Sequence, residues 1–159
     1  MIYVNALITK RLFKMSIYNP FSNYQIAIPK QYSEEVKKFC KQSEPRAQGE
    51  FTPFNRQVDL WYFAFIYAVK TNIKLQHFST NDVSNITAAS ILEDYHVKHM
   101  QMVYLADNQD IEKLDEAREM FNYVSALANA GIPHVLQILN DIEEGKPLYN
   151  LLDTIEEHS

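Results

Sequence analysis

The feature that most constrains this chain is the stretch 54–71, in which nearly every side chain is apolar or aromatic. The stretch is too long for a single β-strand, and a helix that is apolar all round is normally covered by other elements on every side. Thr52 offers a capping oxygen, Pro53 suits the first helical position, and Asp59 lies early enough to favour the helix dipole. We therefore expect a buried central helix over residues 54–71.

Apolar residues at helical spacing predict further helices on both sides of the central one. Gly131 is expected to end one helix, and Pro133 is expected to start the next. The helix over 87–106 is expected to carry four residues inward: Ile91, Tyr95, Met102 and Leu105. The expected helices besides the central one are 31–42, 87–106, 111–130, 133–145 and 147–157.

The resulting fold class is mainly α, a compact bundle of five to six helices around the apolar helix, in a single domain over residues 1–159. Residues 1–15 are interpreted as either a ragged extension or an alternative start, with Met1 and Met15 as the two candidate first residues. An extended N-terminal arm follows. Within this arm the weak alternation over 24–28 predicts a short edge strand.

Composition excludes several classes of protein. A single cysteine, Cys40, excludes a disulfide framework and a multi-cysteine zinc site, and we expect its side chain to be a small buried hydrophobe. Three glycines are too few for a phosphate-binding loop or a dinucleotide-binding turn. No apolar run reaches the roughly 18 residues of a membrane span, and no cleavable signal pattern opens the chain, so the expected place is the cytoplasm.

Charge is distributed unevenly along the chain. Residues 1–50 hold eight Lys/Arg and four Asp/Glu, whereas residues 101–159 hold three and twelve. The acidic part disfavours broad contact with nucleic acid, while the basic segment 30–46 could contact an acidic partner or nucleic acid. Two further charged residues lie three apart at the start of the central helix, as an ion pair or a cap. The predicted partner-binding residues are Lys30, Lys37, Lys38, Arg46, Arg56 and Asp59.

The strongest candidate for chemistry is Glu93 with His96. Glu-x-x-His is the spacing of carboxylate-bridged di-iron bundles, but such a site needs two copies and two further glutamates, and the chain holds one copy. We therefore interpret both residues as surface polar groups of an amphipathic helix. The sequence predicts no catalytic, cofactor-binding or metal-binding residue, no cofactor, and a protein that is not an enzyme.

Two stretches together resemble small proteins encoded beside bacterial DNA-phosphorothioation (Dnd) and related anti-phage defence loci. One is the phenylalanine-led "VDLW…A…VK" helix within 51–70, and the other is the "A-N-A-G" hinge within 121–136 that leads into an apolar helix. The resemblance covers the central helix and the two helices after Ala106. It implies an accessory role in a defence or DNA-modification system, with no established active site to transfer.

Two functions follow as hypotheses. The first is a non-enzymatic accessory or interaction subunit that docks on a larger protein, such as an operon-encoded ATPase or nuclease, or forms a homo-oligomer. The second is a small DNA-binding regulator that uses the segment 30–46. Nucleic acid is the less favoured partner, and no membrane partner is expected.

Overall fold

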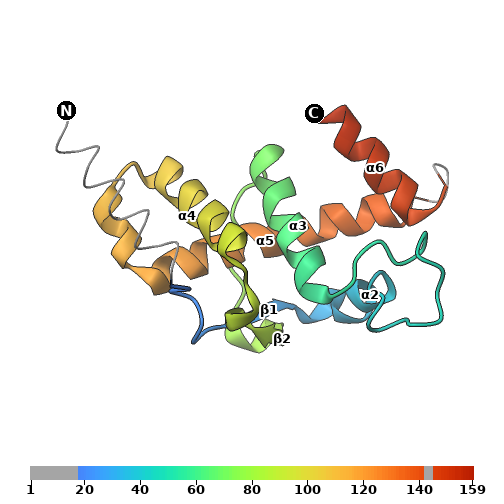
Figure 1. Cartoon of the computed structure of the whole chain (residues 1–159), viewed down its shortest axis with the longest axis horizontal. Helices are drawn as coiled ribbons and strands as arrows, with labels where there is room; N and C mark the ends of the chain where they lie inside the picture. The colour runs from blue at the N-terminus through green and yellow to red at the C-terminus, as the bar shows by residue number, and fades with distance from the viewer. Residues whose placement is uncertain (1–17, 142–144) are drawn as a thin grey trace. The chain divides into compact units, whose positions relative to one another are not determined.

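The computed structural model of the chain describes residues 18–141 and 145–159, which form a mostly helical structure with one two-stranded sheet (Figure 1). The prediction of a mainly helical chain is confirmed, and so is the short N-terminal strand. The alternative starts at Met1 and Met15 lie outside the described residues. The elements are β1 (Gln25–Pro29), η1 (Lys30–Tyr32), α2 (Ser33–Lys38), α3 (Gln57–Lys70), η2 (Thr80–Asp82), β2 (Val83–Ala88), η3 (Ala89–Ile91), α4 (Asp94–Asn108), η4 (Ile111–Asp115), α5 (Ala117–Leu139) and α6 (Pro147–Glu157).

The chain divides into two compact units. Unit 1 comprises the residues up to Ile26 together with 87–124, and unit 2 comprises 27–86 together with 125–159. The prediction of a single domain stays a prediction. None of the helices in the described part of the chain combines the length and apolarity that a bilayer-spanning segment requires.

Unit 1 contains aromatic contacts between the segment 18–24 and the start of α5. The ring of Phe121 lies 5.6 Å from that of Phe21 and 5.1 Å from that of Tyr24. Asn19 donates from Nδ2 to the carbonyl oxygen of Ala89 at 2.9 Å, while its Oδ1 accepts from the backbone of Phe21. These bonds fix the segment before β1 against the turn that follows β2.

Helix α4 buries a different face from the one that the sequence predicts. Ile91, Tyr95 and Met102 were expected in the core but are 38, 49 and 61 % exposed, whereas His96 and Gln101 are buried. The prediction is wrong because this helix mixes polar and apolar residues on both sides, so periodicity does not distinguish them. The expected helical start is wrong too, since β-branched residues in 83–88 form β2 instead.

Unit 2 contains α2, α3, α6 and the second part of α5. The expected helix over 31–42 is shorter, because η1 precedes α2 and the helix ends at Lys38. Cys40 lies beyond this end in a parallel bridge with Phe54 and is buried, as expected. Burial raises the pKa of the Cys40 thiol to about 12, and the charge of Asp59 adds to the effect. This thiol therefore stays protonated at neutral pH.

Helix α3 occupies most of the predicted stretch 54–71. Its buried residues are all apolar, namely Val58, Leu60, Trp61, Ala64, Phe65 and Ala68. Helix α6 has the predicted bounds 147–157, with Pro147 in its first turn.

Helix α5 continues through the point where the sequence predicts a break. We expected Gly131 to end one helix and Pro133 to start another, but α5 runs from Ala117 to Leu139 with Pro133 inside it. A Cβ on Gly131 would lie 2.2 Å from the carbonyl oxygen of Ala64 in α3. The glycine therefore permits close packing of two helices instead of capping one of them.

Candidate interaction surface

The predicted basic segment belongs to unit 2 and contains both signs of charge. Lys30 in η1 and Lys38 at the end of α2 are exposed, and so is Arg46 in the loop 39–56. None of these three cations forms an ion pair with another residue that the structure describes. Lys37, in contrast, pairs with Glu34 at 2.7 Å. The segment also holds Glu35 and Glu44, so its positive charge is partly offset.

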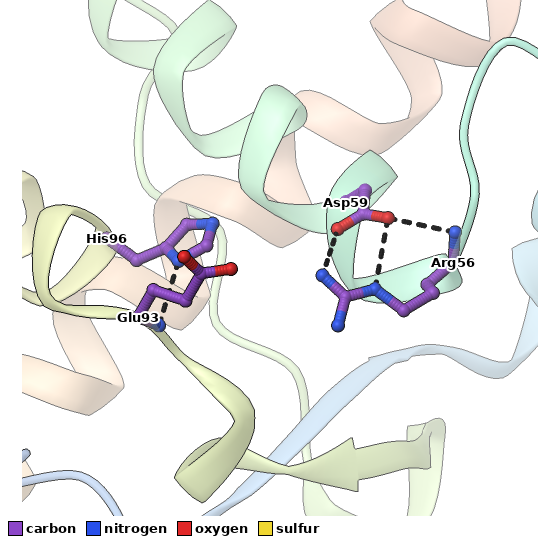
Figure 2. A network of polar contacts seen from close by, with 4 residues as sticks. All are labelled: Arg56, Asp59, Glu93 and His96. Atoms are coloured by element: carbon purple, nitrogen blue, oxygen red, sulfur yellow. Dashed lines mark hydrogen bonds and ion pairs between the residues drawn. The ribbon is translucent and has the colours of Figure 1, made fainter.

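The predicted pair Arg56 and Asp59 is both an ion pair and a cap at the start of α3 (Figure 2). Asp59 accepts from the backbone N–H of Arg56 at 2.9 Å and from its Nε at 3.2 Å, while Nη2 lies 2.8 Å from Oδ1. Both side chains are less than one-third exposed. A charged pair in this fork geometry is worth more than an ordinary surface pair. These two residues therefore have a structural role in holding the first turn of α3.

The loop 39–56 is held at both ends and in its middle. The backbone N–H of Lys41 donates to Phe54 at 2.8 Å, which closes the ends. In the middle, Glu50 forms an ion pair with Lys146 and accepts from the Tyr149 hydroxyl at 3.1 Å. The hydrogen bond from Lys146 is the main cause that lowers the pKa of Glu50, and the bond from Tyr149 adds to it. The loop is thus fastened to the start of α6.

Glu93 and His96 form a reciprocal cap at the start of α4 (Figure 2). The backbone N–H of Glu93 donates to Nδ1 of His96 at 3.0 Å. Because Nδ1 accepts, the proton of the neutral ring is on Nε2. Contrary to the expected surface position, His96 is 4 % exposed. Across residues 18–141 and 145–159 there is no group of three or more His, Cys, Asp or Glu that could hold a metal ion.

A group of exposed apolar side chains lies on α6, and the sequence pattern does not predict their exposure. Three residues of this helix are 44–47 % exposed, namely Tyr149, Leu152 and Ile155. Phe51 in the loop 39–56 is 46 % exposed. Leu148, Leu151, Leu152 and Ile155 follow the 3,4 spacing that is typical of an amphipathic helix. Only Leu151 of that pattern is fully buried. The spacing identified the helix but could not show how much of its apolar face stays open.

An apolar cavity lies between α3 and α6, and Ile155 forms part of its wall. Its volume is about 240 Å³, and its apolar walls are Phe63, Ile66 and Tyr67 of α3 and Ile155 of α6. The rings of Phe63 and Tyr67 are stacked with centroids 6.4 Å apart, and His158 meets Tyr67 edge-on at 6.0 Å. Lys70, Thr154, His158 and Ser159 supply the polar part of the lining.

Three carboxylates lie on the C-terminal part of α6. Asp153, Glu156 and Glu157 are exposed, and none of the three is in an ion pair with a described residue. They lie in the last two turns, where the carbonyl end of the helix dipole is itself negative. We refer to the exposed residues Tyr149, Leu152 and Ile155, the cavity and these three carboxylates together as the α6 face.

Comparison with known proteins finds no match, either among protein-family models, among curated proteins or among solved structures.

Proposed function

We propose that this protein is a non-enzymatic interaction subunit that docks on a larger protein through unit 2. The observation that carries the proposal is the α6 face, where Tyr149, Leu152 and Ile155 are exposed and Ile155 also lines an apolar cavity. Exposed apolar side chains gathered on one helix are costly in water, and such a group commonly marks a protein–protein contact. A subunit of this kind contributes a surface rather than a reacting group.

The system to which we assign the subunit is a bacterial DNA-modification or anti-phage defence system. This assignment comes from the resemblance of the stretches 51–70 and 121–136 to small Dnd-associated proteins. In this proposal the partner is an operon-encoded ATPase or nuclease, or a second copy of the chain, and the complex acts in the cytoplasm.

The proposal also includes the arrangement of the helices, which is a bundle centred on α3. Its support is the set of six buried apolar residues on α3 and the close approach of Gly131 to Ala64. A rigid centre of this kind would hold the α6 face in a fixed shape, which favours binding because little order is lost on association.

The competing candidate is a DNA-binding regulator that uses the segment 30–46. The observation in its favour is that Lys30, Lys38 and Arg46 are exposed and pair with no described carboxylate. If it holds, K37E together with K38E should abolish a gel shift of duplex DNA at low salt. A wild-type protein that produces no shift at low salt would remove this candidate.

The test of the proposed function is a tagged pull-down of the full chain expressed with its genomic neighbours, at low and at high salt. We expect one stoichiometric protein partner, with recovery that falls as salt rises because charged contacts are screened. Recovery of the protein alone, or with nucleic acid only, would overturn the proposal.

A further inference from the structure

We infer that the α6 face binds a basic amphipathic helix of the partner protein, with one bulky apolar side chain of that helix seated in the cavity between α3 and α6. This inference rests on the proposed function and gives the partner a definite chemistry.

The size of the cavity favours an anchor side chain over a whole ligand. Small-molecule sites typically enclose about 300–1,000 Å³, and this cavity has about 240 Å³. Its stacked walls, Phe63 and Tyr67, suit an aromatic or large aliphatic group. Buried anchors of this type contribute most of the binding energy in many protein interfaces.

The line of exposed residues on α6 favours a helix as the binding element. Tyr149, Leu152 and Ile155 follow one another at intervals of three along one side of the helix. Ridges of this kind pack into the groove between side chains of another helix. Recognition of an amphipathic helix by an apolar groove is a common mode of peptide binding, in which the anchors of the bound helix recur at intervals of three and four residues.

The charge of the α6 face favours a basic partner. Asp153, Glu156 and Glu157 are exposed, and their charges add to the negative end of the helix dipole instead of offsetting it. The basic residues in the cavity lining are one lysine, Lys70, and His158. Lysine or arginine residues beside the apolar face of the partner would neutralise the three carboxylates and steer association.

The first experiment uses two labelled amphipathic peptides of about 15 residues, roughly four helical turns. Both have leucines and one phenylalanine on the apolar face; the basic peptide has lysines on the polar face, and the control peptide has glutamates there. Binding to the full-length protein is followed by fluorescence anisotropy. We expect the basic peptide to bind at least about tenfold more tightly than the acidic one, with affinity that falls as salt rises. Equal binding of both peptides, or no binding of the basic one, would overturn the inference.

Matched variants locate the binding to the cavity. Ile155→Glu should weaken binding of the basic peptide by about tenfold or more, because it places a charge at the wall of the cavity. Leu75→Glu introduces the same charge at a residue of unit 2 with similar exposure, and should leave the affinity unchanged. Ile155→Ser should weaken binding in the same direction without adding a charge. The emission of Trp61, the single tryptophan, reports whether each variant is folded.

A charge series tests the second part of the inference. Glu156→Gln together with Glu157→Gln should lower the affinity for the basic peptide by about threefold to tenfold at low salt and less at high salt. The control pair, Glu44→Gln with Glu112→Gln, removes the same charge from exposed residues elsewhere. An equal effect of the two pairs would show that only net charge matters, and would overturn the α6 site.

The same variants separate this inference from the proposed function. If wild type and Ile155→Glu recover the same stoichiometric partner equally well, the α6 site is wrong and the interaction subunit stands. If wild type recovers no partner, the proposed function fails. A concentration-dependent dimer in analytical ultracentrifugation that is lost in Ile155→Glu would make a second copy the occupant, and would overturn the inference of a basic helix.

Discussion

Helices α3 and α4 are similar in length but are packed in different ways. Helix α3 buries only apolar residues, and its neighbour α5 approaches it at Gly131. Helix α4 buries His96 and Gln101 among its apolar residues and leaves Met102 in solvent. Both helices have a polar cap at the first turn, so the difference lies in the packing: α3 depends on a close apolar fit, whereas α4 buries fewer apolar residues and includes polar ones.

The largest expected effect tests the close fit of α3. Gly131→Ala should lower the free energy of unfolding by about 3 kcal/mol or more, because the new Cβ would lie 2.2 Å from the Ala64 carbonyl oxygen. Chemical denaturation followed by Trp61 emission measures the change. Gly49→Ala is the control, since nothing lies within 4 Å of the Cβ that this substitution adds. Equal stability of the two variants would show that the helices separate easily at this point.

The next effect tests which face of α4 is buried. Met100→Ala should cost about 2–3 kcal/mol, because Met100 is fully buried and its removal leaves a cavity. Met102→Ala, two residues further on, should change stability by less than about 0.5 kcal/mol. Denaturation followed by far-UV circular dichroism gives both values. A larger effect at Met102 would restore the face that the sequence predicts.

A smaller effect tests the cap of α3 against a surface pair. Asp59→Ala should cost about 1 kcal/mol, since it removes the acceptor of the Arg56 backbone N–H and of its guanidinium. Glu34→Ala breaks the exposed pair with Lys37 on α2, and should cost no more than about 0.5 kcal/mol. Thermal melts of the two variants measure the difference. Equal losses of unfolding free energy in Asp59→Ala and Glu34→Ala would show that the fork geometry adds no stability.

The smallest effect concerns alkaline pH in unit 1. Burial raises the pKa of Tyr123 from 10.0 to about 12, and its hydrogen bond to Asp107 adds to the shift. The folded state therefore disfavours the phenolate, so this contribution to stability is complete below pH 10 and is lost as pH rises towards 12. Tyr123→Phe should make the loss of stability over this range shallower in denaturation curves. Asp107→Asn should have part of the same effect, and an unchanged slope in both would contradict the shift.

The elements that were predicted well have strong patterns of their own. The length and apolarity of 54–71 exclude a strand, and the leucines of α6 follow Pro147 at regular spacing. The continuity of α5 depends on a contact with Ala64, which is far away in the sequence, so local signals at Gly131 and Pro133 could not predict it. Glu93 and His96 were expected on the surface, but their use as a cap depends on where α4 begins.

The candidate site was predicted less well than the fold. Charge alone selected Lys30, Lys38 and Arg46, and their role in binding stays a prediction. The spacing of the leucines predicts the helix α6, but it does not show that Leu152 is partly exposed. The α6 face was missed because a cavity depends on how two helices meet, which neither helix encodes alone.

The approach of Gly131 to α3 has a consequence for how this sequence can drift over generations. The atom in the way is the backbone carbonyl oxygen of Ala64, which every amino acid carries. No substitution at position 64 can therefore make room for a side chain at position 131. Any replacement of this glycine requires the backbone of α3 or α5 to shift. Selection should therefore keep glycine at position 131, while exposed residues near it change more freely.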